Sequence, residues 1–359
     1  MKQALVLHEL RITALRNLDK FSLVPGRRLT VIAGDNGRGK TSLLEAAYLA
    51  ATSRSFRTTN LEDLVQRGKQ EGVAHIRVAE GDALVRDQLV AISGGRRIVK
   101  ADGKRPPSLA AFAVRSPMVC FHAGELELST GPAGPRRTLL DRIALFFDPA
   151  AGEHRTRAQT ALRERQRALE QRGVSARDLD AWEELAATHG AALSRARARA
   201  ADEIGRAATR AFLRIAAPGL ELTMAYVPGG SASIEEARAQ LAARRQKDLM
   251  RGLATFGPHR DELALSLDGS PARAVASQGQ HRAITLALKL AEVAAIGHAR
   301  GLHPLLLLDD LSSELDASRT DALLRHLADS PCQMLVTTTR PELFRAPFVA
   351  PEDRSDITL

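Results

Sequence analysis

The sequence predicts an α/β fold in which a P-loop sheet and an antiparallel β subdomain are joined to an inserted short helical lobe. A β-branched run that leads into a glycine-rich loop, residues 29–41, predicts the first sheet. Strand-like pieces separated by turn residues, between residues 73 and 101, predict the second sheet. An Ala- and Arg-rich segment with helical periodicity predicts the lobe. We therefore expect three parts, residues 1–149, 150–215 and 216–359, with the middle one inserted between two halves of the sheet domain.

The sheet elements follow from alternation and from short buried runs. We expect strands at residues 4–13, 20–24, 29–33, 73–79, 83–93, 96–101, 118–121, 221–227, 262–267, 303–311 and 333–339. The pieces between 73 and 101 are separated by glycine turns, so they predict an antiparallel meander. Helices are expected at about 40–51, 233–252 and 316–328 and in the apolar run that follows residue 282, and residues 346–359 are expected to form a loose tail.

Apolar side chains in the lobe recur every three or four residues, as on one face of a helix. They are Trp182, Leu185, His189, Leu193, Ala196, Ala200 and Ile204. Leu162 and Leu169 mark a preceding helix, and QRGVSARD (171–178) offers a turn with a new N-cap at Ser175 or Asp178. The pattern stops after two or three heptads, which favours a helical hairpin over a long coiled coil.

Residues 34–41, GDNGRGKT, match the pattern G-x-x-x-x-G-K-[ST] between a buried strand and a helix. The glycines let the backbone curl so that N–H groups point at phosphate oxygens, and the helix N-terminus faces the same anion. The Lys40 ammonium would reach the β- and γ-phosphates as a catalytic cation, and the Thr41 hydroxyl would bind Mg²⁺. The residues expected to hold ATP here are Gly34, Asp35, Asn36, Gly37, Arg38, Gly39, Lys40, Thr41 and Ser42.

Two adjacent carboxylates follow the leucine run 305–308. The carboxyl end of a central strand is where open α/β sheets bind ligands. Asp309 would hold Mg²⁺ together with Thr41, and Asp310 would act as the catalytic residue that orients or deprotonates the attacking water.

SQGQHR (277–282) stands directly before an apolar helix. A P-loop, a Ser-x-Gly-Gln signature and a strand ending in two acids occur here in the order of ABC-type ATPases, which predicts an ABC-type ATPase head. In that class the signature meets the nucleotide of a second copy, so Ser277, Gly279 and Gln280 are expected to act in trans. SSELD (312–316) takes the place of the loop that crosses the dimer seam, with Ser313, Glu314 and Asp316 at the dimer contact.

The separation of Lys40 from Ser277 is larger than in transporter subunits and resembles the SMC-like branch, in which an insertion splits the head. The chain resembles, more narrowly, the RecF family of bacterial recombination mediators over nearly its whole length. The stretches that carry this resemblance are LRNLDKFSL, GDNGRGKTSLLEAAYLA, RSFRTTNLEDLV (54–65), GPAGPRRTLLDR (131–142), TFGPHRDEL (255–263), SQGQHR and LLLLDDLSSELD.

The resemblance implies a cytoplasmic ATPase that dimerises on binding ATP with Mg²⁺. It also implies binding to duplex or gapped DNA at single-strand junctions, work with RecO and RecR, and help in loading the RecA recombinase during repair and replication restart. The expected switch histidine is absent, since Thr337, Thr338 and Thr339 stand in its place, and no Q-loop glutamine is evident. Asp310 is one methylene shorter than the usual glutamate, so hydrolysis is expected to be slow and to act as a timer.

Positive charge supports a polyanionic partner. The formal net charge is +9, and the last part of the chain, residues 301–359, is acidic, so the excess lies before it. With 4% aromatic residues, stacking on single-stranded bases is not indicated, and arginine contact with a duplex backbone fits better. Arginine-rich genome composition explains part of the excess. The residues expected to contact DNA or phosphate are Arg54, Arg57, Arg136, Arg137 and Arg260. The alternative is a solvated surface for Arg54 and Arg57 and a local salt bridge for Arg260, while Arg136 and Arg137 are expected to serve either the nucleotide or the DNA.

Other features exclude several classes. The N-terminus lacks a signal-peptide pattern, and the longest aliphatic run, Leu305–Leu308, is too short to span a bilayer, so no membrane partner is expected. Cys120 and Cys332 are far apart and indicate buried thiols. Two rival functions remain open: the energising subunit of a transporter, which the basic lobe disfavours, and a scaffold that binds ATP without turnover.

Overall fold

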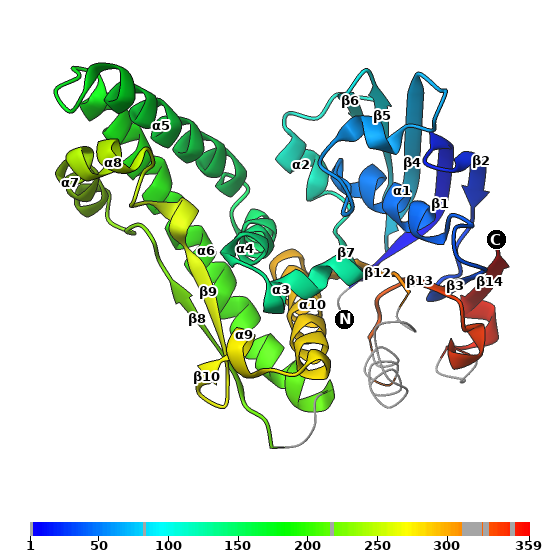
Figure 1. Ribbon diagram of the computed structural model, residues 1–359. Helices are drawn as coiled ribbons and strands as arrows, with labels where there is room; N and C mark the ends of the chain where they lie inside the picture. Colours follow the sequence, from blue (N-terminus) through cyan, green and yellow to red (C-terminus); the bar gives the residue numbers. More distant parts are fainter. Residues whose placement is uncertain (1–2, 82–83, 216–218, 311–324, 326–329, 345–348) are drawn as a thin grey trace. The chain divides into compact units, whose positions relative to one another are not determined.

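The computed structural model describes residues 3–81, 84–215, 219–310, 325, 330–344 and 349–359 (Figure 1). The chain forms two compact units. Unit 1 contains Met1–Leu126, Arg210–Gly219 and Ser277–Leu359, and unit 2 contains Glu127–Thr209 and Leu220–Ala276. Most of the predicted lobe lies in unit 2, which also includes residues on both sides of it; the three-part division stays a prediction.

A five-stranded parallel sheet carries the phosphate-binding loop in unit 1. Its strand order is β14-β3-β13-β12-β7. The strands are β3 (Leu29–Ala33), β7 (Met118–Phe121), β12 (Leu305–Leu308), β13 (Met334–Thr338) and β14 (Arg354–Thr358). The central strands are buried runs of aliphatic residues, as expected for a parallel sheet covered on both faces.

The prediction of a loose C-terminal tail is wrong. Residues 354–358 form the edge strand β14, which pairs in parallel with β3, and Leu359 donates its N–H to the Ala33 carbonyl at 2.9 Å. The side chains of this edge strand are at most partly buried, because a strand at the edge of a sheet has a neighbour on one side only. Its five-residue pattern is therefore too weakly apolar to be recognised from the sequence.

The second sheet of unit 1 is antiparallel except for one short edge pairing, and confirms the predicted meander. Its order is β11-β1-β4-β5-β6, with β2 paired to β1. The strands are β1 (Gln3–Leu15), β2 (Leu18–Leu23), β4 (Glu71–Glu80), β5 (Leu84–Ser93), β6 (Arg96–Ala101) and β11 (Leu302–His303). Helix α1 (Lys40–Thr52) is almost entirely buried and packs against strands of both sheets, so one core joins them.

The remaining described elements of unit 1 are short, with one exception. They are η1 (Leu61–Leu64), α2 (Leu109–Ala113), η2 (Ala123–Leu126), η4 (Pro341–Phe344), η5 (Pro351–Asp353) and the long helix α10 (Gln278–Arg300). Helix α10 begins after Ser277 and ends at Gly301, which has the left-handed conformation common at helix ends.

Unit 2 is mainly helical and confirms the predicted helical hairpin. Helices α5 (Ala151–Arg172) and α6 (Leu179–Ile215) flank the predicted turn, and Asp178 directly precedes α6. The other helices are α3 (Glu127–Thr130), α4 (Ala133–Phe147), α7 (Ile234–Ala243), α8 (Arg245–Arg251), η3 (Pro258–Arg260) and α9 (Ala272–Val275). A small sheet of β8 (Leu222–Val227), β9 (Glu262–Leu267) and β10 (Ser270–Pro271) completes the unit. The single helix expected at 233–252 is interrupted at Arg244.

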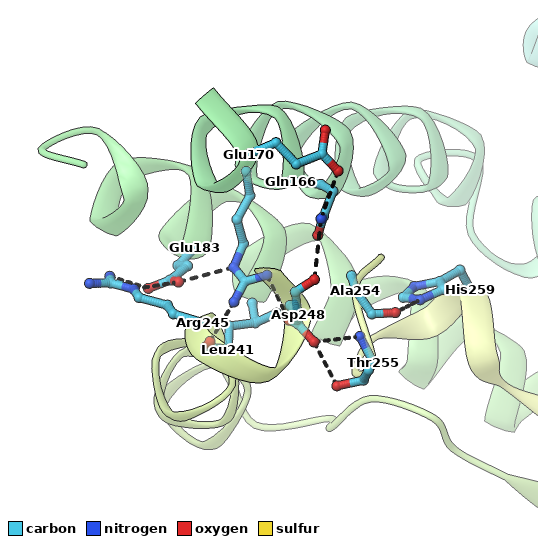
Figure 2. Close-up of polar contacts among 10 residues, drawn as sticks. Gln166, Glu170, Glu183, Leu241, Arg245, Asp248, Ala254, Thr255 and His259 are labelled. Atoms are coloured by element: carbon cyan, nitrogen blue, oxygen red, sulfur yellow. Dashed lines mark hydrogen bonds and ion pairs between the residues drawn. The ribbon is translucent and has the colours of Figure 1, made fainter. Parts of the chain in front are cut away.

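Figure 2 shows part of a network of charged side chains in unit 2, among them Glu183, Arg245 and Asp248. Arg165 of α5 has a side-chain exposure of 0% and donates to Glu183 at 3.0 Å, to Asp248 at 2.8 Å and to the Leu241 carbonyl at 2.6 Å. Arg245 donates to the same Glu183. Because a buried charge is tolerated only when it is paired and hydrogen-bonded, this network selects one packing of α5, α6, α7 and α8.

Asp261 of the TFGPHRDEL stretch is a further buried charge in unit 2. Its carboxylate accepts hydrogen bonds from Arg197, from the Tyr226 hydroxyl and from the Gly229 N–H. Arg197 also forms a paired contact with Asp141 of α4. The stretch therefore ties α4 and α6 to the small sheet, which explains why charged residues occur at this position.

Candidate nucleotide-binding site

The P-loop lies between β3 and the N-terminus of α1, as predicted. Gly39 caps the helix with φ 103°, and Gly37 has φ 83°, both in the region that favours glycine. A Cβ on Gly39 would lie 3.0 Å from the Asn17 amide nitrogen, and Asn17 itself donates to the Gly37 carbonyl at 3.1 Å. Asn17 was not singled out from the sequence, although it lies in the LRNLDKFSL stretch.

Lys40 is buried and its ammonium lies against the loop. It donates to the Gly34 carbonyl at 2.6 Å and to the Asp35 carbonyl at 2.8 Å. Residues 35–38 of the loop are exposed and Ser42 is buried in α1. A loop with positive φ angles, a helix N-terminus and an adjoining ammonium fits the triphosphate of ATP, because all three favour negative charge.

The residues predicted to bind magnesium meet across the sheet. The Thr41 hydroxyl donates to Asp309 Oδ1 at 2.9 Å, and the Thr337 hydroxyl donates to the same oxygen at 2.7 Å. The contact arises because β13 lies between β3 and β12, which places the carboxyl ends of the three strands together. A hydroxyl and a carboxylate are oxygen ligands of the kind that Mg²⁺ prefers, so the pair fits this ion.

Asp309 and Asp310 differ in their surroundings. Burial raises the pKa of Asp309, and the negative charge of Asp310 adds to the rise, against the hydrogen bonds from Thr337 and Thr41. Asp310 has φ 47°, and its N–H donates to the Thr337 hydroxyl at 3.0 Å. Left-handed backbone at a non-glycine residue is uncommon and concentrates at functional sites. Thr337 thus forms hydrogen bonds with both Asp309 and Asp310. It lies within β13 and not in the segment that follows it.

Glu45, which was not predicted, collects several donors one turn after Thr41. It is 1% exposed and accepts hydrogen bonds from Arg16 at 2.9 Å and from Arg57 at 3.3 Å. The charge of Arg57 also acts on Asp309. Arg57 therefore lies close enough to the site to support its predicted phosphate contact. Glu45 could not be predicted as its partner, because a single glutamate in an otherwise apolar helix matches no sequence motif.

The signature stretch forms a complete helix cap. Ser277 precedes α10, its hydroxyl accepts from the Gln280 N–H, and the Gln280 side chain accepts from the Ser277 N–H at 2.6 Å. Gly279 is the second residue of the helix. This capping box accounts for serine and glutamine locally and leaves open their predicted action in trans. The predicted dimer residues Ser313, Glu314 and Asp316 lie outside the described residues.

The predicted DNA-contact arginines separate into two groups. Arg54 and Arg57 are exposed directly after α1, and Arg260 is exposed and forms no ion pair with the residues that the structure describes. Arg136, in contrast, is 7% exposed and forms paired hydrogen bonds with Glu262 at 2.7 and 2.8 Å. Arg137 donates to the Asp261 carbonyl at 2.8 Å and is half-buried.

The predicted DNA or phosphate contact of Arg136 is therefore replaced by a structural role within unit 2. Its remaining donor contacts go to the Leu128 and Gly131 carbonyls, so four of the five N–H groups of the guanidinium are used within unit 2. A local salt bridge was not among the roles expected for Arg136, which were contacts with the nucleotide or with DNA.

The sequence is similar to that of a family of known proteins along most of its length. The family model described as the RecF/RecN/SMC N terminal domain matches residues 6–349. The "DNA replication and repair protein RecF" of Anaeromyxobacter sp. (strain Fw109-5) is 39% identical over 96% of this chain and 94% of its own length. This chain belongs to the RecF family. RecF proteins of Myxococcus xanthus and Deinococcus radiodurans are 38% and 35% identical over 94% and 92% of the chain, and over 91% of their own lengths.

Solved structures confirm the predicted ABC-type head fold. The recombination mediator protein RecF-ATP in the RecFOR pathway superposes with a TM-score of 0.84 at 25% identity, covering 94% of this chain and 93% of that one. The Smc head domain of Pyrococcus furiosus superposes with a TM-score of 0.56 at 15% identity, covering 95% and 91%, and shows the fold alone. Among the helices that the structure describes, none is long and apolar enough to cross a bilayer.

Proposed function

We propose that this RecF-family protein is an ATP-gated DNA-binding protein that dimerises on ATP. The observation that carries the proposal is the meeting of Thr41 and Asp309 beside the P-loop, at a Thr41 Oγ1–Asp309 Oδ1 distance of 2.9 Å. Lys40 and the loop N–H groups would hold the phosphates, and Thr41 and Asp309 would hold Mg²⁺. The bound ion would supply charge neutralisation at the phosphates.

Dimerisation follows from the position of the signature at an exposed helix N-terminus. Ser277, which is exposed, caps α10, and Gln280, which is partly exposed, lies in the first turn of this helix of 23 residues, whose N-terminus favours an anion. In the proposed dimer, Ser277, Gly279 and Gln280 of one copy cap the γ-phosphate held by Lys40 of the other. ATP then adds contacts that the nucleotide-free subunits lack, so association depends on ATP.

Hydrolysis is proposed to be slow and to release the dimer. Asp310 would orient or deprotonate water. Its backbone N–H donates a hydrogen bond to the Thr337 hydroxyl, which fixes the backbone that carries the carboxylate. An aspartate reaches less far than a glutamate, which leaves the water less well positioned. The cycle would act as a timer for DNA release.

The biological setting is proposed from the family. The protein would act in the cytoplasm on duplex DNA next to single-stranded gaps, with RecO and RecR, and would promote RecA loading in repair and replication restart. The net charge of +9 supports a nucleic-acid partner.

Mixing two inactive variants tests the composite site. Lys40→Ala removes the phosphate cation, and Ser277→Arg blocks the signature of the same chain. A mixed dimer regains one intact site, built from Lys40 of one copy and Ser277 of the other. We expect neither variant alone to dimerise with ATP and Mg²⁺ in analytical ultracentrifugation, and the mixture to do so. Monomers in the mixture, alongside dimers of the wild type, would show that the two residues do not share a nucleotide.

A further inference from the structure

A pocket on unit 1, away from the P-loop residues, is lined by three arginines. It has a volume of about 410 Å³ and is formed by Val85, Arg86, Asp102, Val114, Arg115 and Arg300. These residues come from β5, from the turn after β6, from the segment after α2 and from the C-terminal residue of α10. They are far apart in the sequence, so no motif marks them.

Positive charge exceeds negative charge in this pocket. Arg86 pairs with Glu80, and Arg115 pairs with Asp102. Arg300 is exposed and forms no ion pair with the residues that the structure describes, which leaves one net positive charge. Burial lowers the pKa of Arg86, and the charges of Arg115 and Arg300 act in the same direction, so both of these arginines lie near Arg86.

One donor of Arg115, a residue that lines the pocket, has no acceptor. The Nε–H of Arg115 is buried and has no hydrogen-bond partner among the described atoms. Its Nη2 donates to Asp102, and its carbonyl accepts from Arg86, so the side chain is held in place while Nε remains unsatisfied. A buried donor without an acceptor is unfavourable, and an anionic oxygen within its reach would satisfy it.

We propose that this pocket binds a phosphate group of a nucleic-acid backbone, through Arg115 and Arg300, with Arg86 fixing Arg115. Guanidinium groups bind phosphate oxygens through paired N–H donors, which matches the surplus charge and the unsatisfied Nε. Val85, 51% exposed, and Val114 provide an apolar wall that suits the carbons of the adjoining sugar. The inference rests on the proposed DNA binding and assigns a location to it.

Salt-dependent DNA binding by the full-length protein tests this site. We expect Arg300→Gln to weaken binding to a fluorescent duplex about 3- to 10-fold, and to lower the slope of log K against log salt by about 1. Arg115→Gln combined with Arg300→Gln should lower the slope by about 2. Arg67→Gln is the matched control, because Arg67 is exposed in the same unit and forms no ion pair within the described part of the chain. Thermal unfolding and binding of a fluorescent ATP analogue should be unchanged in Arg300→Gln.

The outcomes separate the site from the function. If the wild type binds duplex DNA and the double variant binds it with equal affinity and slope, the pocket assignment is overturned and the proposed function stands. If the wild type binds no DNA with or without ATP, both are overturned. Titration with pyrophosphate tests whether the pocket holds a free polyphosphate instead. If the wild type binds a second equivalent of pyrophosphate that the double variant does not bind, while both proteins bind DNA equally, the assignment to a nucleic-acid backbone is also overturned.

Discussion

The Thr41 hydroxyl donates a hydrogen bond to Asp309 Oδ1 at 2.9 Å, although the two residues are 268 positions apart in the chain. Thr41 is the second residue of α1, and Asp309 directly follows β12. The pair therefore reports directly on whether the two halves of the sheet have assembled into a nucleotide site.

Asp309→Asn should stabilise the nucleotide-free protein while weakening Mg²⁺-dependent ATP binding. The folded state raises the pKa of Asp309, so folding favours the neutral carboxyl. The cost of the ionised form is absent below the ordinary pKa of 3.8, grows as pH rises from that value to the folded-state pKa, and stays constant above it. We expect the variant and wild type to melt together in acid and the variant to melt higher at neutral pH. A variant that melts lower at neutral pH would contradict this balance.

Lys40→Ala should lower ATP affinity about 10- to 100-fold, because a charged hydrogen-bond donor to the phosphates is lost. DNA binding without ATP should remain weak, salt-sensitive and equal to that of the wild type, since Lys40 lies in the P-loop. Gel or filter binding to duplex, single-stranded and gapped DNA, with and without ATP, measures both effects. An ATP response that survives in the variant would contradict the assignment of Lys40.

Asp310→Asn should trap the dimer. Asparagine tolerates the left-handed conformation that Asp310 adopts, with φ 47°, so the backbone should be preserved. Loss of the carboxylate should slow hydrolysis about 10²- to 10⁴-fold. Analytical ultracentrifugation with ATP and Mg²⁺ should then show a persistent dimer, and a purely monomeric variant would contradict the clamp.

Substitutions at Ser277 separate the helix cap from the proposed contact in trans. Ser277→Asp keeps a good N-cap but places a negative charge toward the γ-phosphate, so the melting temperature should hold and ATP-dependent dimerisation should be lost. Ser277→Ala should destabilise the protein by about 1 kcal/mol. Equal dimerisation by wild type and Ser277→Asp would limit Ser277 to its capping role.

Arg165→Leu should destabilise unit 2 strongly, by about 3–5 kcal/mol, because Glu183 and Asp248 would be left buried and short of a partner. Arg167→Leu is the control on the same helix. Arg167 is exposed and pairs with Glu164, so its loss should cost less than about 1 kcal/mol. Urea unfolding followed by tryptophan fluorescence reports on this unit through Trp182. Similar midpoints for the two variants would rule out the network as a main determinant of packing.

The local parts of the fold and site were predictable. The P-loop, the strands β3 and β12, the meander and the α5–α6 hairpin depend on glycine placement and on apolar periodicity within short windows. The adjacent acids Asp309 and Asp310 and the signature SQGQ were recognised for the same reason, because each motif consists of residues that are neighbours in the sequence.

Only the tertiary structure decided which distant groups meet. It placed Glu45 under Arg16 and Arg57, buried Arg136 against Glu262, paired β14 with β3, and brought Arg86, Arg115 and Arg300 into one pocket. An arginine reads the same in a sequence whether it is buried in an ion pair or exposed to solvent. Its role depends on the carboxylates that folding brings within hydrogen-bond distance, and no local pattern records that distance.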